Sequence, residues 1–264
     1  MYDRVTSSGR FAIGVAPWRD RIGLARDAVR QELVRRQLAD HLPQRPGRAL
    51  DVGCGQGTQA IALARAGWSV VGVDPENSLL DVAQSTLRAE SAEVQSRTEF
   101  RVGDLFELAA SASERFDIVC CHGVVMYLPS LRDAVAALAD VVAPEGVLSV
   151  LSRNRAGIAM RAGMTGDWQG ALDGFEARTY GNRLGIRDVR ADDPDDVAEA
   201  FRDAGVEPTA WYGVRLFTDH WGDVDPPDEL DGVMEAEDQA GRRDPYRRVA
   251  ALTHTIGRRS VRAW

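Results

Sequence analysis

Short apolar runs alternate with amphipathic stretches along the first 150 residues of the chain. The apolar runs have the length and the Val, Ile and Leu content of buried strands, and they occupy 48–55, 69–74, 98–104, 116–123 and 146–154. The stretches between them place apolar residues at helical spacing, at 58–67, 78–90 and 130–142. A turn at 144–146 precedes the fifth strand. This alternation predicts a parallel sheet with right-handed crossovers and helices on both faces.

The pattern changes after the fifth strand. Residues from 154 to about 188 are rich in Gly, Arg and aromatic residues and are only weakly periodic, so we interpret them as an insertion over the mouth of the sheet. A helix at 193–205 follows, and 209–219 and 248–259 have the pattern of two late strands with an acidic helical stretch between them. Seven strands in total indicate an open α/β sheet, which binds its ligand at the carboxyl ends of its strands.

We therefore expect one domain over 1–264. It would consist of an N-terminal helical segment, a cofactor-binding core, a substrate-side insertion or lid, and the C-terminal part of the sheet. These four parts would span 1–47, 48–153, 154–190 and 191–264.

Composition narrows the function classes. The chain is 44% hydrophobic and 27% charged, which is ordinary for a globular protein. A net charge of −8 argues against a surface that binds nucleic acid everywhere, although it leaves room for a local basic patch. All 32 basic residues are arginine, which excludes a Schiff-base lysine and a P-loop lysine.

The cysteines and the absence of long apolar runs bear on location. Cys54, Cys120 and Cys121 form neither a disulfide framework nor a spaced metal set. The first residues lack the apolar core of a signal peptide, and no run has the length of a membrane span. We expect a cytoplasmic protein without a metal or a membrane anchor, either a monomer or a homodimer.

A glycine-rich turn, 53–57, follows the first strand. Its small residues let the backbone approach a ligand closely. Asp74 ends the second strand, where a ribose diol needs a carboxylate acceptor, and Asp104 ends the third strand, near the place of an adenine ring. These residues predict a nucleotide-like ligand.

A dinucleotide and S-adenosylmethionine are the two candidates for that ligand. The third glycine, Gly57, comes one position too early for the dinucleotide fingerprint. Asp51 lies just before the turn, where its charge would repel a pyrophosphate but would tolerate a cationic sulfonium and ammonium. The turn therefore favours S-adenosylmethionine, with S-adenosylhomocysteine as product, and Asp51 would tune the turn or hold the sulfonium region.

The motifs resemble those of class I S-adenosylmethionine-dependent methyltransferases, which have a Rossmann-like seven-stranded sheet. The resemblance rests on LDVGCGQG, Asp74, GDLFE and FDIVCCHGVVMYL. Over most of the chain the sequence is similar to the SmtA/CmoM-type family. That similarity rests on GLARDAVRQEL, GVLSVLSRNRAGIAM, GVRLFTDHW and RRDPYRRVAALTHTIGRR. The resemblance implies methyl esterification of the carboxylate of 5-carboxymethoxyuridine in the tRNA wobble position.

The same resemblance implies roles for individual residues. Arg26 would bind the methionine carboxylate, and His122 would contact the amino-acid end of the cofactor. The cofactor would lie along the turn, and its nucleoside would meet the strand ends; the residues concerned are Gly53, Cys54, Gly55, Asp74, Asp104 and Leu105. From the residues alone, Arg26 could equally be a solvated helix charge and Asp74 a helix cap.

The acceptor side needs a nucleophile in line with the transferred methyl group. A carboxylate is already ionised at neutral pH, so it needs cationic positioning and no general base. The predicted catalytic residues are Tyr127, Arg153 and Arg178, with Arg155 and Tyr180 as further candidates. In a chain so rich in arginine, a surface role for each arginine remains open.

Two acceptors, tRNA and a small molecule, remain open. Residues 242–262 are strongly basic and the insertion adds Arg161, Arg178, Arg183 and Arg187, so together they could hold an anticodon loop. Three departures from the family pattern, at Tyr127, Arg153 and the sparsely charged run 174–182, keep open a small-molecule O-, N- or C-methyltransferase on the same core. A cofactor-binding module without activity, or a dehydrogenase, is the third alternative.

Overall fold

A seven-stranded sheet forms the centre of the computed structural model, which describes residues 12–21, 23–111 and 114–260. The strand order is β3-β2-β1-β4-β5-β9-β8, and β9 alone runs antiparallel to its two neighbours. The strands are β1 (Arg48–Val52), β2 (Ser69–Asp74), β3 (Thr98–Val102), β4 (Phe116–His122), β5 (Val142–Arg153), β8 (Val206–Val214) and β9 (Leu252–Arg259). The predicted α/β fold with seven strands is confirmed.

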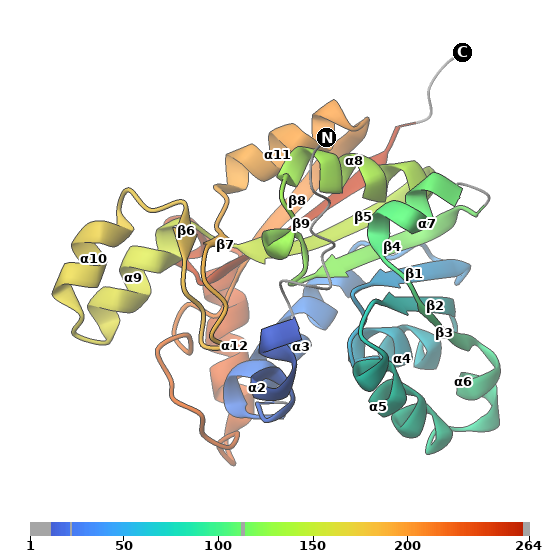
Figure 1. Cartoon of the computed structure of the whole chain (residues 1–264), viewed down its shortest axis with the longest axis horizontal. Helices are drawn as coiled ribbons and strands as arrows, with labels where there is room; N and C mark the ends of the chain where they lie inside the picture. Colours follow the sequence, from blue (N-terminus) through green and yellow to red (C-terminus); the bar gives the residue numbers. More distant parts are fainter. Residues whose placement is uncertain (1–11, 22, 112–113, 261–264) are drawn as a thin grey trace.

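Helices cover both faces of this sheet (Figure 1). The α-helices outside the insertion are α2 (Val15–Arg19), α3 (Ala25–Ala39), α4 (Thr58–Arg65), α5 (Asn77–Arg88), α6 (Ala92–Ser96), α7 (Leu105–Ser111), α8 (Leu131–Val141), α11 (Pro194–Asp203) and α12 (Leu230–Gly241). Short 3₁₀ turns are η1 (Ala12–Gly14), η2 (Val125–Tyr127) and η3 (Tyr246–Val249). Helices α7, α8 and α11 lie on one face, and α3, α4 and α5 lie on the other (Figure 1).

The two faces bury separate apolar cores, because successive side chains of a strand point to opposite faces. Cys121 packs in the core under α8 and α11, whereas Cys120 packs with α4 on the other side. Burial raises the pKa of both thiols, so they remain protonated. These adjacent cysteines are therefore core residues.

The insertion is more regular than its weak periodicity predicts. It forms α9 (Ala156–Met164) and α10 (Trp168–Gly174), followed by β6 (Thr179–Tyr180) paired with β7 (Val189–Arg190). The two helices pack closely because Gly174 faces Ala159, where an added Cβ would lie 2.9 Å from the Ala159 backbone. Contacts between small residues produce no apolar stripe, which explains why the pattern did not predict these helices.

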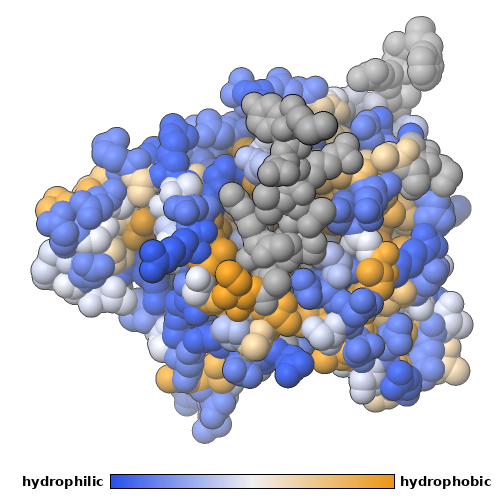
Figure 2. Space-filling view, viewed as in Figure 1, coloured by the Kyte–Doolittle hydropathy of each residue, from blue (hydrophilic) through white to orange (hydrophobic). Residues whose placement is uncertain are grey.

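This α9–α10 pair projects away from the sheet in Figure 1. Figure 2 shows a mostly hydrophilic face, with hydrophobic residues gathered near its centre and at the projecting end. The exposed large hydrophobic residues of α9, α10 and the residue that follows are Met160, Met164, Trp168, Leu172 and Phe175.

Several predicted strand boundaries were wrong. Strand β9 begins at Leu252 instead of residue 248, because the 3₁₀ turn η3 occupies the start of the predicted run. Strand β5 begins at Val142 and passes through the predicted turn at 144–146, where Glu145 has a φ of 61° and the register against β4 shifts. Strand β8 ends at Val214 instead of residue 219, because the next residue, Arg215, takes a φ of 60° and turns the chain.

A buried carboxylate from α12 fixes the loop that follows β8. Glu237 is only 1% exposed and accepts hydrogen bonds from the backbone N–H groups of 216–218, at 2.8–3.0 Å. It also accepts one from the Thr218 hydroxyl at 2.7 Å. Because these donors have few alternatives in the interior, Glu237 determines where Arg215 and Asp219 lie.

The first prediction concerns this loop. Glu237→Leu should lower the free energy of unfolding by about 3 kcal/mol, because buried N–H groups lose their acceptor. Urea denaturation measures the change, and Glu235→Leu, at an exposed position of the same helix, is the matched control. Equal midpoints for the two variants would show that Glu237 does not hold the loop.

Candidate active site

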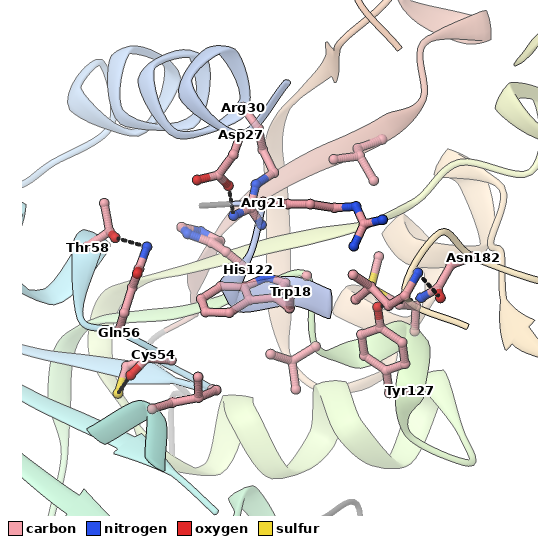
Figure 3. Close-up of a pocket in the computed structure, with 18 of the residues that line it drawn as sticks. Trp18, Arg21, Asp27, Arg30, Cys54, Gln56, Thr58, His122, Tyr127 and Asn182 are labelled. Atoms are coloured by element: carbon pink, nitrogen blue, oxygen red, sulfur yellow. Dashed lines mark hydrogen bonds and ion pairs between the residues drawn. The ribbon is translucent and has the colours of Figure 1, made fainter. Parts of the chain in front are cut away.

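A cavity of about 330 Å³ opens at the carboxyl ends of the central strands. Its wall is formed by the turns after β1 to β4, by α2 and α3, and by the insertion (Figure 3). This is where an open α/β sheet binds ligands, and the volume lies in the range of small-molecule sites. Of the twelve predicted site residues, eleven line this cavity and Arg178 does not.

The glycine turn adopts a backbone that other residues rarely take. Gly53, Gly55 and Gly57 have φ values of 68°, 53° and 81°. A Cβ on Gly53 would lie 2.2 Å from Val124, and one on Gly55 would lie 3.1 Å from the Trp18 ring. Because Gly53 and Gly55 have no Cβ, Val124 and Trp18 pack directly against the backbone of the turn, and this bare backbone lines the cavity.

Asp74 joins this turn to the end of β2. One carboxylate oxygen accepts the N–H of Gly55 at 2.8 Å, and the other accepts the N–H of Glu76 at 2.9 Å. Burial raises the pKa of Asp74, and these two bonds oppose the rise. Each carboxylate oxygen has two lone pairs, so Asp74 retains acceptor capacity towards the cavity.

Asp51 is a second buried acid on the cavity wall. Its side chain is nearly inaccessible, and among the described residues its Oδ2 has no hydrogen-bond partner. Burial raises its pKa to about 7, and the charge of Asp74 adds to the rise. A cationic group in the cavity would favour the ionised form of this carboxyl.

Asp104 and Leu105 lie at the end of β3. Asp104 Oδ1 accepts the N–H groups of Phe106 and Glu107 at 2.8 and 3.0 Å, so it caps α7 while it also lines the cavity. Leu105 is buried and presents an apolar surface there. Cys54 is buried too, and burial raises the pKa of its thiol well above the usual value.

His122 divides the cavity into two halves. Cys54 and Gln56 lie in the half beside the glycine turn, and Tyr127 and Asn182 lie in the other half (Figure 3). His122 Nε2 is 2.8 Å from Ser149 Oγ. Burial lowers the pKa of His122 to about 3, so the ring is neutral. The Tyr127 hydroxyl accepts a hydrogen bond from the Asn182 amide at 3.0 Å.

Several arginines also line the cavity. The guanidinium groups of Arg26, Arg153, Arg161 and Arg215 surround the buried carboxylate of Asp219. Their nearest nitrogens lie 2.8, 3.6, 3.5 and 3.1 Å from its oxygens. All four line the cavity, and we call these five residues the arginine cluster.

The arginine cluster carries more positive than negative charge. Burial alone would raise the pKa of Asp219, but the surrounding arginines lower it well below its usual range. Burial lowers the pKa of Arg215 to about 10. Among the described residues, the Nε atoms of Arg26, Arg153 and Arg215 have no hydrogen-bond partner. Four guanidinium groups share one carboxylate and retain unused N–H donors, so the site favours the binding of a further anion.

Some arginines lie elsewhere than predicted. Arg178, which precedes β6, is 70% exposed and pairs with Asp196 at 3.6 Å, away from the cavity. Arg155 pairs with Asp193 at 2.8 Å instead of facing the acceptor side. By contrast, Arg153 lies over the Tyr180 ring, 4.8 Å from its centre, and both line the cavity.

Sequence reasoning missed Trp18, Arg215 and Asp219. Residues 209–219 were predicted as one continuous strand, so the turn at Arg215 that brings Arg215 and Asp219 together with Arg26 was not expected. Their spacing of four residues was the only signal, and it is common among solvated pairs. Trp18 belongs to α2, lines the cavity and lies against the glycine turn at Gly55.

Comparisons with known proteins agree with this geometry. Residues 50–150 match the family described as "Methyltransferase domain". The ubiquinone biosynthesis O-methyltransferase of Bordetella avium is 31% identical over 185 residues, which are 68% of this chain and 69% of that protein. The tRNA 5-carboxymethoxyuridine methyltransferase of Escherichia coli K12 is 26% identical over 241 residues, 90% of this chain and 89% of that protein.

A solved structure extends the likeness to the whole fold. Magnesium protoporphyrin IX methyltransferase from Synechocystis PCC 6803, with bound SAH, superposes with a TM-score of 0.61 at 18% identity and covers 94% of both chains. The chain belongs to the class I S-adenosylmethionine-dependent methyltransferases. Its cofactor is S-adenosylmethionine, which supplies an electrophilic methyl group when bound.

Two other properties concern only the described part of the chain. Within it, no helix is long and apolar enough to cross a membrane. Over the same residues, no group of three or more His, Cys, Asp or Glu side chains is arranged to hold a metal ion.

The second prediction uses the burial of Asp51. Its carboxyl is neutral in the folded protein below about pH 7 and ionised in the unfolded chain above about pH 4, so stability should fall as pH rises between these values. A pKa rise from 3.8 to about 7 corresponds to about 4 kcal/mol at most. Asp51→Asn should remove that loss, as measured by denaturant unfolding at several pH values. An unchanged pH dependence in the variant would contradict the assignment.

Proposed function

We propose that this protein transfers a methyl group from S-adenosylmethionine to a carboxylate, and that the acceptor is 5-carboxymethoxyuridine in the wobble position of tRNA. The observation that carries the proposal is the arginine cluster, in which four guanidinium groups share one carboxylate beside the cofactor half of the cavity. Such a site binds and positions an anionic acceptor.

The cofactor half would hold the nucleoside against the ends of β1, β2 and β3. Asp74 would accept the ribose hydroxyls, since it lines the cavity and its carboxylate oxygens retain lone pairs. Leu105, beside Asp104, would pack against the adenine. The bare backbone of Gly53, Cys54 and Gly55 would run along the cofactor.

The amino-acid end would lie near His122 and Arg26. Asp51 would stabilise the positive charge of the sulfonium region, because its ionised form is otherwise disfavoured. Arg26 would bind the methionine carboxylate, and its unpartnered Nε and its place in the arginine cluster support that role. The cofactor and the acceptor would thus share one cationic region.

The acceptor carboxylate would lie on Arg153, Arg161 and Arg215. Because it is ionised at neutral pH, the protein needs to supply orientation and exclusion of water rather than a base. The stacking of Arg153 on Tyr180 restrains its guanidinium, and Tyr127 would close the same side of the pocket. Turnover would then depend on how firmly these groups hold the carboxylate in line.

Two observations support tRNA as the carrier of this carboxylate. The similarity to the Escherichia coli tRNA 5-carboxymethoxyuridine methyltransferase spans most of both chains. Helix α9 also packs against η3, which brings the insertion beside the basic segment that contains Arg243 and Arg248. A basic segment beside the insertion suits an anticodon loop, and such a substrate would place the protein in the cytoplasm.

A small-molecule acceptor is the second candidate. The ubiquinone biosynthesis O-methyltransferase of Bordetella avium shares 31% identity with this chain, and the cavity of about 330 Å³ suits a small anionic acceptor. The arginine cluster would serve a free carboxylate as well as one on RNA.

Methyl transfer from radiolabelled S-adenosylmethionine to bulk tRNA, purified from cells lacking this gene, separates the candidates. We expect label in the tRNA that mild alkali releases as methanol, as a methyl ester requires. Alkali-resistant label would mean another tRNA atom. No label, with cofactor binding shown by calorimetry, would overturn the tRNA assignment and favour the small molecule.

The third prediction tests the ribose contact. Asp74→Ala should weaken binding of S-adenosylmethionine by about 1–3 kcal/mol, the cost of leaving hydrogen-bonding partners unpaired. Isothermal titration calorimetry measures the change, with Asp81→Ala on the exposed side of α5 as the control. An affinity equal to that of the control variant would refute the ribose assignment.

The fourth prediction tests the acceptor side with a pair of arginines from the insertion. Arg161→Ala should raise the KM for the acceptor by about tenfold or more and leave cofactor affinity nearly unchanged. Arg178→Ala removes an exposed arginine that faces Asp196, and it should change neither quantity. If both variants behave alike in steady-state kinetics, the arginine cluster does not bind the acceptor.

A further inference from the structure

A chain of buried polar side chains leads from His122 into the protein interior. Gln37, Ser149 and His254 are completely buried, although none of them contacts the cavity. The sheet register sets His122 of β4 beside Leu151 of β5, and Leu151 beside His254 of β9, so both rings lie on one face. Helix α3 covers that face and supplies Gln37.

Three of the hydrogen bonds along this chain are 2.8 Å long, and the fourth is longer. His122 Nε2 and His254 Nε2 each lie 2.8 Å from Ser149 Oγ. His254 Nδ1 lies 2.8 Å from Gln37 Oε1, and Gln37 Nε2 donates to the carbonyl oxygen of Gly213 at 3.3 Å. We call these linked groups the relay.

The far end of the relay sets the direction of every bond in it. The Gly213 carbonyl can only accept, so the Gln37 NH₂ faces it and the Gln37 oxygen faces His254. His254 must therefore carry its proton on Nδ1. Burial lowers the pKa of His254 far below its usual value, so the ring is neutral and its Nε2 is an acceptor.

The directions of the two hydrogen bonds at Ser149 follow in the same way, and they fix the position of the proton on His122. The serine hydroxyl has one proton, which it donates to His254 Nε2, so its oxygen accepts from His122 Nε2–H. His122 is itself neutral, because burial and the nearby charge of Arg30 lower its pKa. Its Nδ1 therefore carries a lone pair, and among the described residues the bond to Ser149 is the only side-chain hydrogen bond of this ring.

We propose that the relay locks His122 in the Nε2–H tautomer, so that Nδ1 accepts a hydrogen bond from the ammonium group of the cofactor's amino-acid part. The proposal rests on the cofactor contact proposed above for His122 and adds the reason for its protonation state. Arg26 and Arg30 also line this part of the cavity, and a protonated His122 would add a further positive charge beside the ammonium. Ser149 and His254 thus act as positioning residues.

The relay has a spectroscopic signature that needs no variant. In ¹⁵N NMR of the protein with S-adenosylhomocysteine, His122 should show a protonated Nε2 and an unprotonated Nδ1, and His254 should show the reverse. Opposite tautomers in the two rings would show that the bonds of the relay run in the direction derived above. The same tautomer in both rings, or a charged His122, would overturn the proposal.

A binding comparison tests the consequence for the ligand. S-adenosylhomocysteine should bind about tenfold more tightly than its analogue lacking only the amino group, as for one hydrogen bond to a charged donor. Ser149→Ala, which frees His122 to change tautomer, should remove most of that ratio. Tyr212→Phe removes the neighbouring 2.7 Å bond to His41 and should leave the ratio unchanged.

The outcomes of this comparison are distinct. If the wild-type protein binds both ligands equally, or if Ser149→Ala retains the full ratio, the proposal about the relay is wrong while the cofactor assignment stands. If the wild-type protein does not bind S-adenosylhomocysteine at all, the cofactor contacts proposed above are wrong, and the relay proposal that rests on them is wrong as well.

Discussion

The carboxylate of Asp219 holds together four arginines that come from α3, β5, α9 and the loop after β8. Buried guanidinium groups repel one another, and one shared carboxylate offsets only part of that repulsion. The arrangement depends on Glu237, which fixes the loop on which Arg215 and Asp219 lie. The surplus positive charge faces the cavity, and an anionic ligand would balance it.

The opposite end of the cavity, beside the glycine turn, is acidic. Asp51 and Asp74 are buried acids near bare glycine backbone, and burial raises the pKa of both. A cavity that is acidic at one end and cationic at the other suits a cationic methyl donor placed beside an anionic acceptor. His122, neutral and anchored through Ser149, lies between these ends.

The sequence was most informative where function depends on neighbours in the chain. The glycine turn, Asp74 and Asp104 follow directly from strand ends, and strand ends of a parallel sheet meet at one edge. Arg215 and Asp219 could not be found this way, because their partners are distant in sequence and an unpredicted turn directs them inward. The α9–α10 pair was missed because small residues, which leave no periodic pattern, hold it together. Arg178 shows the converse, since an arginine in the right segment faces solvent.

Recognition of the wobble-uridine carboxylate by the arginine cluster is the central claim. It is tested most directly by calorimetric binding of anticodon stem-loops to the protein saturated with S-adenosylhomocysteine. The stem-loops would carry 5-carboxymethoxyuridine, its methyl ester or unmodified uridine at the wobble position. The account predicts that the acid binds at least about tenfold more tightly than the ester or the uridine. Equal affinity for all three would contradict it.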